Sequence, residues 1–273
     1  MGLLTILRKL KARQRHMRLL LLGLDNAGKT SVMHALLGTP PLGEDGAPTP
    51  IAPTVGFDIH TLTVGSRVSD SAAAVTASPS TPAGGDDIGD GSAVTTTIHV
   101  WDVGGQASIR PFWRNYFDAT DGLLFVVDAA DPARLPAAGR VMAQVCKEER
   151  LAGVPLCILA NKQDVPGAMD ARSVAAALGL LGGEGRGARG VEEEGGVGLI
   201  GDKRHWMVFP CTAMGGGGAW QGDTSVNGGD SENGALAVPA GAAADRVDLA
   251  VRGLAEGVSW LVADVSARLF EGL

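Results

Sequence analysis

The amino-acid sequence predicts an α/β fold, in which a mostly parallel, doubly wound sheet of six strands is flanked by helices. Three observations support this fold class: apolar segments alternate with segments of helical periodicity, two of the apolar segments are nearly continuous, and 45% of the 273 residues are hydrophobic. Continuous apolar segments are typical of strands that are covered on both faces. Because strands alternate with helices, we expect ligands at the carboxyl ends of the strands.

Six segments have the composition of strands: 18–23, 57–64, 95–101, 122–128, 154–160 and 205–211. The fourth and fifth are apolar at nearly every position, which predicts that both lie inside a parallel sheet. The second and third are rich in β-branched residues and flank a long insertion. We therefore expect these two segments to pair as a hairpin with a very long tip.

Four segments are predicted to be helical: 1–15, 29–38, 133–150 and 254–269. The last carries a stripe of six apolar residues from Leu254 to Leu269. The first has leucines on one side and basic residues elsewhere, which predicts a short amphipathic helix. Such a helix can dock on its own domain, on a partner or on a membrane surface.

Glycine is concentrated in three segments without apolar periodicity, which span 65–94, 182–201 and 214–245 and hold 23 of the 40 glycines. We interpret them as Gly/Ala-rich insertions that act as flexible filler, because long structureless loops inside a compact domain are uncommon. The expected organisation is an N-terminal amphipathic helix at 1–15 followed by one domain at 16–273.

Composition and charge argue against several classes of protein. The net charge of −7 disfavours a general nucleic-acid binder, and the positive charge clusters near the N-terminus. No apolar run is long enough to span a bilayer, no secretory signal is present, and Ile6 stands where a myristoylation pattern requires Ser or Thr. The cysteines Cys146, Cys157 and Cys211 lack metal-binding spacing, which indicates reduced thiols. We expect a cytoplasmic protein with at most weak membrane contact.

The segment GLDNAGKT at 23–30 matches the phosphate-loop pattern G-x-x-x-x-G-K-[ST] and lies between an expected strand and an expected helix. Backbone N–H groups and the helix dipole can bind phosphates there, Lys29 can reach the β- and γ-phosphate oxygens, and Thr30 offers a hydroxyl to Mg²⁺. The residues predicted to bind the phosphates are Asp25, Asn26, Ala27, Gly28, Lys29, Thr30 and Ser31.

The segment LANKQD at 159–164 follows a predicted strand and supplies the groups that guanine specificity requires. The carboxylate of Asp164 can accept from two adjacent donors of guanine, N1–H and the 2-amino group, and adenine has no such pair. Asn161 and Lys162 are expected beside the base, with the Lys162 stem over the base plane. The remaining residues expected there follow the last strand and are Cys211, Thr212 and Ala213.

Two further segments complete the expected site. Thr54 of PTVGF can reach Mg²⁺ if its loop folds over the nucleotide. In WDVGGQ, Asp102 can hold a water bound to Mg²⁺, and the Gly105 amide can contact a γ-phosphate. Gln106 is predicted to orient the attacking water and is the expected catalytic residue. The predicted metal ligands are therefore Thr30, Thr54 and, through water, Asp102.

These four motifs, in this order, resemble those of the small GTPases, and the tryptophan before the aspartate of WDVGGQ is similar to the Arf branch. The resemblance extends to MGLLTILRKLK, LLGLDNAGKT, WRNYF, EERLAG, ANKQD and GVSWL, and it covers essentially all of the chain outside the insertions. It implies a P-loop small GTPase fold. It also implies a GTP/GDP switch that uses Mg²⁺, hydrolyses GTP slowly alone and binds effector proteins in the GTP state.

The resemblance further implies partners and a location. A GTPase-activating protein and a tubulin folding cofactor are the implied protein partners, regulation of lipidated cargo is an alternative role, and a cytoplasmic, cytoskeleton-associated monomer is expected. Asp58 departs from the family pattern, in which asparagine is usual, and adds a negative charge beside a switch. The insertion 65–94 lies in the hairpin that slides between nucleotide states in this family. A floppy tip would preserve the slide, whereas a packed insertion would alter it.

Two other functions were weighed against the switch. A P-loop kinase would leave Asn161, Asp164 and Gln106 unexplained, and the sequence offers no arginine cluster for a phosphate acceptor. A binding module without catalysis is disfavoured because every expected catalytic position is filled. Four aromatic residues are divided evenly between the core and a partner-binding surface, because such residues serve both: Phe112, Trp113, Tyr116 and Phe117.

Overall fold

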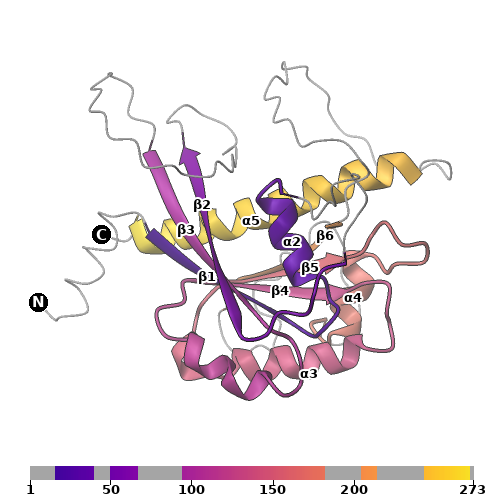
Figure 1. Cartoon of the computed structure of the whole chain (residues 1–273), viewed down its shortest axis with the longest axis horizontal. Helices are drawn as coiled ribbons and strands as arrows, with labels where there is room; N and C mark the ends of the chain where they lie inside the picture. Colours follow the sequence, from indigo (N-terminus) through magenta and orange to yellow (C-terminus); the bar gives the residue numbers. More distant parts are fainter. Residues whose placement is uncertain (1–15, 40–49, 67–93, 182–203, 214–242, 271–273) are drawn as a thin grey trace, which may run out of the picture.

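The computed structural model describes residues 16–39, 50–66, 94–181, 204–213 and 243–270. Six strands form one sheet in the order β2-β3-β1-β4-β5-β6, in which β2 is antiparallel to β3 and the other neighbours are parallel (Figure 1). The strands are β1 (His16–Gly23), β2 (Phe57–Ser66), β3 (Val94–Val103), β4 (Gly122–Asp128), β5 (Leu156–Asn161) and β6 (Trp206–Pro210). The predicted six-stranded, mostly parallel sheet is confirmed.

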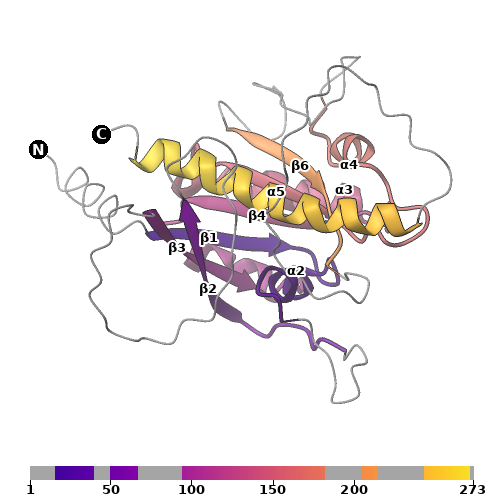
Figure 2. The ribbon, with the colours of Figure 1, turned by 90° about the horizontal axis from the view of Figure 1, so that it is seen from above.

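Helices cover both faces of this sheet. The α-helices are α2 (Lys29–Leu36), α3 (Leu135–Cys146), α4 (Ala171–Ala177) and α5 (Ala243–Phe270), and the 3₁₀ helices are η1 (Arg110–Tyr116) and η2 (Glu149–Leu151). Helices α2 and α5 pack on one face, and α3 and α4 pack on the other (Figure 2). The structure is therefore an α/β sandwich of three layers.

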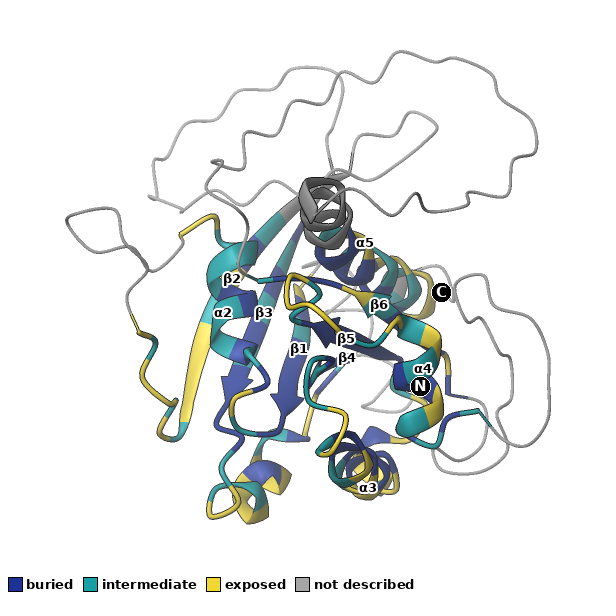
Figure 3. Cartoon of the chain, turned by 90° about the vertical axis from the view of Figure 1, so that its right-hand side faces the viewer, coloured by how far each residue is buried: buried dark blue, intermediate teal, exposed yellow. Residues whose placement is uncertain are grey.

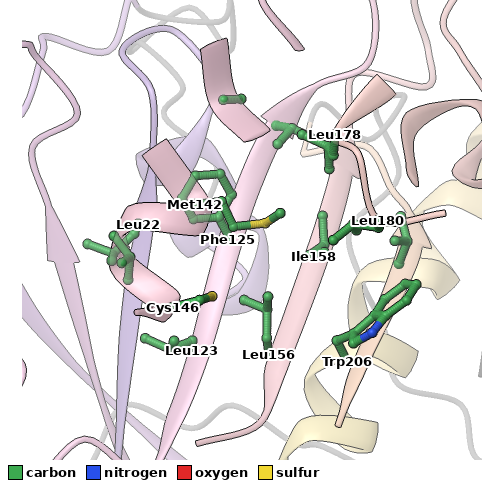
Figure 4. Packing of buried hydrophobic residues seen from close by; sticks show 14 of the residues in the cluster. Leu22, Leu123, Phe125, Met142, Cys146, Leu156, Ile158, Leu178, Leu180 and Trp206 are labelled. Carbon is green, nitrogen blue, oxygen red and sulfur yellow. The ribbon is translucent and has the colours of Figure 1, made fainter. Parts of the chain in front are cut away.

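Each face of the sheet buries its own apolar cluster. Successive side chains of a strand point to opposite faces, so Leu20 of β1 packs on the α3 and α4 side, and Leu21 packs on the α2 and α5 side. Figure 4 shows the first cluster, in which Met142 of α3 lies over Phe125 of β4. Each of these side chains is at most 1% exposed, and burial of one such side chain stabilises the fold by about 1.5–3 kcal/mol.

Helices α3 and α4 differ from the predictions. The sequence does not predict α4, because its seven residues carry no apolar stripe; its start is marked by Asp170, whose carboxylate accepts a backbone N–H three residues later at 2.7 Å. The segment 133–150, predicted as one helix, contains α3 and the separate turn η2. The buried guanidinium of Arg204 donates to the carbonyls of Cys146 and Leu151, which satisfies the ends of both elements.

The hairpin strands are longer than predicted. The ladder of β2 and β3 runs from the pair Phe57–Val103 to the pair Ser66–Val94, so both strands extend into the segment 65–94 that was predicted as an insertion. The composition of that segment does not indicate where pairing stops, because backbone hydrogen bonds rather than side chains continue the ladder. The predicted hairpin is confirmed.

Other predictions concern residues outside the described part of the chain. The N-terminal helix at 1–15 and the insertion 182–201 lie there, as does most of the insertion 214–245. Helix α5 begins at Ala243, before the predicted start at 254, and its first three residues fall within the segment expected to be that insertion. None of the described helices is both long and apolar enough to cross a bilayer.

Candidate functional site

The carboxyl ends of the five parallel strands meet along one side of the sheet, and four of them carry a predicted site segment. The segments are 23–30 after β1, 102–106 at the end of β3, 161–164 at the end of β5 and 211–213 after β6. The inner strands are buried, whereas β2 at the sheet edge is exposed over much of its length (Figure 3). The topology therefore brings together residues that lie far apart in the sequence.

The phosphate loop forms a tight turn between β1 and α2. Asn26 and Gly28 have left-handed φ angles of 61° and 89°, Ala27 is buried, and Ser31 lies in the first turn of α2. The Ala27 amide donates to the Leu24 carbonyl at 3.4 Å, which closes the turn. Left-handed residues in such a turn direct backbone N–H groups toward one point, as anion sites require.

Lys29 lies at the centre of this loop. Its side chain is buried, and Nζ donates to the carbonyls of Gly23 at 3.2 Å and Leu24 at 2.9 Å. Burial lowers the pKa of Lys29, and the charges of Asp102 and Asp25 oppose that shift. A buried ammonium group whose hydrogen-bond acceptors are neutral carbonyls favours the approach of an anion.

Three oxygen-bearing side chains from separate segments meet next to this lysine. Thr30 Oγ1 donates to Asp102 Oδ2 at 2.8 Å and lies 2.9 Å from Thr54 Oγ1. Because the single hydroxyl hydrogen of Thr30 is directed to the carboxylate, Thr54 is the donor in the second bond. Burial raises the pKa of Asp102, and its Oδ1 atom is buried without a hydrogen-bond partner among the described residues. Two hydroxyls and a carboxylate with one unsatisfied buried oxygen fit Mg²⁺ and its water ligands.

The segment after β3 lies directly against the phosphate loop. A Cβ atom on Gly105 would lie 2.4 Å from both the Gly23 carbonyl oxygen and Lys29 Nζ, so only glycine allows this approach. The Gly104 amide donates to the Gly56 carbonyl at 2.9 Å, which fastens the 53–57 loop to the end of β3. Both loops that were expected around a γ-phosphate are therefore closed over the phosphate loop.

Two arginines that the sequence does not single out hold Asp25 of the phosphate loop. Arg110 and Arg134 donate to Asp25 Oδ1 at 3.1 and 2.8 Å, and Arg110 Nε also donates to the Gly105 carbonyl at 2.9 Å. Burial acts to raise the pKa of Asp25, but the charge of Arg134, a backbone hydrogen bond and the charge of Arg110 together lower that pKa. The partly exposed Gln106 follows Gly105, and its carbonyl accepts the Arg110 amide at 3.2 Å. Arg110 therefore ties the segment that contains Gln106 to the phosphate loop.

Asn161 joins the far end of the site to the phosphate loop. The residue is 2% exposed, its Nδ2 atom donates to the Ala27 carbonyl at 2.9 Å, and its Oδ1 atom accepts the Ala213 amide at 3.1 Å. A Cβ atom on Gly28 would lie 2.3 Å from Asn161 Nδ2, so the glycine leaves room for this amide. One buried side chain thus fixes three loops relative to one another.

The other residues predicted at the base lie on the same two loops. The Thr212 hydroxyl donates to the exposed carboxylate of Asp164, and Lys162 Nζ lies 2.6 Å from Asp128 Oδ2 at the end of β4. Cys211 instead connects loops through its backbone, because its amide donates to a β5 carbonyl at 2.9 Å and its carbonyl accepts an amide of the 161–164 loop at 3.1 Å. Its side chain is fully buried, and burial raises the pKa of the thiol. All three cysteines are free and buried, in agreement with the prediction of reduced thiols.

The aromatic residues near η1 divide as predicted. Trp113 and Phe117 are each 2% exposed and belong to the core, whereas Phe112 is 59% exposed. Tyr116 is half-buried, and its ring centroid lies 5.0 Å from that of Phe57 on β2. Two of the four aromatic residues therefore serve packing, and two are accessible at the surface beside the hairpin.

A solved structure with the same fold supports this architecture. The structure of the Arl6 BBS3 small GTPase from Trypanosoma brucei, with the bound nucleotide analogue GppNp, aligns with a TM-score of 0.53 over 92% of this chain and 98% of its own. The sequence identity is 22%, so the match supports the fold alone.

Sequence relatives and a family model are more specific. ADP-ribosylation factor-like protein 2 of Arabidopsis thaliana is 32% identical over 99% of this chain and 98% of its own length, and that of Drosophila melanogaster is 41% identical over 66% and 78%. ADP-ribosylation factor-like protein 3 of Chlamydomonas reinhardtii is 36% identical over 81% and 95%. The sequence model of the ADP-ribosylation factor family matches residues 3–69 and 73–227. These matches confirm the predicted resemblance to the Arf branch and show similarity to Arf-like proteins 2 and 3, and the chain belongs to the ADP-ribosylation factor family.

Proposed function

We propose that this chain is an Arf-like regulatory switch that binds GDP and GTP, hydrolyses GTP slowly by itself and binds effectors in the GTP state. One observation carries the proposal: Thr54 and Gly105, from two separate loops, both close on the phosphate loop beside Lys29 and Thr30. A γ-phosphate together with Mg²⁺ is the ligand that would stabilise this closed arrangement, because both loops could contact it. A diphosphate alone would offer both loops fewer contacts.

The side chains have distinct roles in this proposal. Thr30 and Thr54 would hold Mg²⁺ through their hydroxyls, and the unpaired Oδ1 atom of Asp102 would accept a hydrogen bond from a metal-bound water. The ion, when bound, neutralises charge on the β- and γ-phosphates. Lys29 would exchange its carbonyl partners for phosphate oxygens, and Gln106 would orient the attacking water. Arg110 keeps Gln106 close to the phosphate loop.

Guanine specificity is assigned to the opposite end of the site. Asp164 would accept from N1–H and the 2-amino group of the base, and Thr212, which donates to the same carboxylate, would fix its orientation. Lys162 is held by Asp128 at 2.6 Å, so its stem can lie along the base plane. Asn161 would act indirectly by holding the loops in register.

Exposed apolar residues on the closing loops supply a surface for effectors. Val55, Phe57, Ile59 and Phe112 are 86%, 41%, 50% and 59% exposed, although large apolar residues are more often buried. They lie on the 53–57 loop, β2 and η1, which would change together with the nucleotide. A partner that covers them would therefore distinguish the GTP state from the GDP state.

The finer assignment of partners follows the relationship to Arf-like protein 2. The proposed partners are a GTPase-activating protein, a tubulin folding cofactor and, as the alternative, carriers of lipidated cargo. The protein would bind them as a monomer in the cytoplasm or at the cytoskeleton. A purified tubulin folding cofactor should bind Gln106→Leu loaded with GTP at least tenfold more tightly than Thr30→Asn loaded with GDP. Equal affinities, measured by calorimetry, would remove this partner from the proposal.

The substitution Asp164→Asn tests base recognition directly. It keeps the shape of the side chain but turns one acceptor into an NH₂ donor, which would oppose the 2-amino group of guanine at a cost of about 1–3 kcal/mol. Xanthine has a carbonyl at that position. The variant should therefore prefer xanthosine triphosphate to GTP, reversing the preference of the parent, whereas the control Asp118→Asn, an exposed carboxylate paired with Arg150, should not. An unaltered preference for GTP would exclude Asp164 from the site.

A further inference from the structure

Asp58 of β2 has no role in the proposed switch, although the register of the sheet places it opposite a residue of the candidate metal site. In the antiparallel ladder of β2 and β3, Asp58 is the direct partner of Asp102. Direct cross-strand partners project from the same face of the sheet, with Cβ atoms about 4.5–5.5 Å apart. Asp58 is exposed and Asp102 is fully buried, so one carboxylate stands at the surface next to the other.

The surroundings of Asp102 favour a cation. Its Oδ1 atom is buried and has no hydrogen-bond partner among the described residues. The charge of Asp58 raises the pKa of Asp102 in addition to burial, whereas the charges of Lys29 and His60 oppose that effect. The carboxylate of Asp102, with its unsatisfied buried oxygen, thus lies at the point where Thr30 and Thr54 meet, and Asp58 is its partner in the ladder.

We propose that Asp58 is a further carboxylate of this divalent-cation site: without contacting the ion, it raises the affinity for Mg²⁺ and makes nucleotide retention depend more steeply on Mg²⁺. The inference deepens the proposed function and rests on it. The physical reason is that the electrostatic effect of Asp58 on nucleotide binding changes sign when the cation binds. Without a cation, Asp58 repels both Asp102 and the nucleotide phosphates; with Mg²⁺ in place, it attracts the ion that holds them together.

The expected effect is moderate because Asp58 is exposed and water screens its charge. An exposed charge one strand away from the metal-binding carboxylate should change the affinity for Mg²⁺ by about three- to tenfold. Asp58→Asn removes the charge and keeps the shape of the side chain, and Asp58→Glu retains the charge. The control Asp118→Asn removes an exposed carboxylate at the end of η1, where it pairs with Arg150.

The test uses the full chain loaded with fluorescent GDP or a fluorescent GTP analogue. Release rates are measured with excess chelator and at saturating Mg²⁺, and the Mg²⁺ concentration of half-maximal retention is titrated. In Asp58→Asn the ratio of the two rates should fall by about three- to tenfold and the half-maximal concentration should rise by a similar factor, with Asp58→Glu and Asp118→Asn close to the parent.

The outcomes separate the inference from the function on which it rests. The parent chain should retain GDP. If it does, and if Asp58→Asn changes neither the ratio of release rates nor the half-maximal Mg²⁺ concentration, the role of Asp58 is overturned and the proposed switch stands. A parent that retains neither guanine nucleotide overturns both. Equal losses in Asp58→Asn and Asp118→Asn also contradict the inference, because the effect would then reflect net charge rather than the place of Asp58 opposite Asp102.

Discussion

The base end and the phosphate end of the candidate site are held by different kinds of contact. At the base end, the buried amide of Asn161 bonds to the loops at Ala27 and Ala213, and backbone hydrogen bonds connect the 161–164 loop to the loop after β6. At the phosphate end, the 53–57 loop is held by the hydroxyl contact of Thr30 with Thr54 and by the Gly104 amide. The 105–106 segment is held to the phosphate loop through the partly exposed side chains of Arg110 and Asp25. In the proposed switch, the first end would stay fixed and the second would open.

The sheet shows the same difference. β4 and β5 are buried inside the sheet, whereas β2 is an edge strand that pairs with β3 alone among the described strands. Moving the β2–β3 hairpin disturbs the pairing of β3 with β1, and it leaves the three parallel pairs from β1 to β6 unchanged. A shift of the hairpin therefore changes one parallel pair at one side of the sheet, whereas a rearrangement of the base end would change the pairs of β4, β5 and β6.

The largest effect is expected at Gln106. Gln106→Leu should bind GTP as the parent does but lose hydrolysis stimulated by an activating protein. The arginine that such a protein supplies is worth up to about 10⁵-fold, or roughly 7 kcal/mol of barrier, and it acts on a correctly oriented water. Single-turnover rates with and without the activator provide the measurement. Equal stimulated rates in variant and parent would contradict this role.

Asn161→Ala should break the scaffold end. The change leaves the Ala27 carbonyl and the Ala213 amide without their partner, at a cost of about 1–3 kcal/mol for each group. Because the loss is at the base end, affinities for GDP and GTP should fall by the same factor. Urea unfolding and nucleotide titration measure the two consequences, and a loss confined to GTP would place Asn161 in the switch instead.

Thr54→Ala should affect the phosphate end alone, so that GTP affinity falls more than GDP affinity. It removes a hydroxyl that contacts Thr30 only when the 53–57 loop is closed, so GTP affinity should fall by about 1–2 kcal/mol and GDP affinity should change by less than about 0.5 kcal/mol. Thr54→Ser keeps the hydroxyl and should resemble the parent. Equal losses of GDP and GTP affinity in Thr54→Ala would show that the loop closes on both nucleotides.

The smallest effect is expected from His99 on β3. Burial, with a smaller contribution from the neighbouring His16, lowers the pKa of His99 below its ordinary value of 6.5. The unfolded chain then binds the proton first as the pH falls, so the stability that neutral His99 contributes is present above pH 6.5 and decreases below it. Urea midpoints should fall less from pH 8 to pH 5 in His99→Asn than in the parent. A steeper fall of the urea midpoint in His99→Asn than in the parent would show that neutral His99 does not stabilise the folded chain above pH 6.5.

The parts of the site that could be predicted are those in which one short segment contains all the groups needed for a contact or a turn. GLDNAGKT fixes a turn, a lysine and a hydroxyl within eight residues, and the six strands each carry their own apolar pattern. The contact of Arg134 with Asp25 could not be predicted, because the two residues are 109 positions apart and meet only when α3 packs on the sheet. Helix α4 was missed for a related reason: its helical conformation depends on a cap and on packing rather than on a stripe.

The same reasoning applies to Asp102. The sequence indicates that it ends a strand beside the phosphate loop, but its unpaired oxygen and its pairing with Asp58 follow from burial and register. Register cannot be derived from composition here, because the long segment 67–93 separates the two strands in the sequence. The charge of Asp58 can therefore be related to the candidate metal site only from the folded chain.

The difference between a fixed base end and a movable phosphate end can be measured most directly by hydrogen exchange in the full chain, with GDP and with a non-hydrolysable GTP analogue. Peptides that cover 53–57 and 103–117 should exchange at least tenfold more slowly with the GTP analogue. Peptides that cover 158–164 and 208–213 should exchange equally in both states. Equal exchange at the first pair of segments, or a change confined to the second pair, would contradict the account.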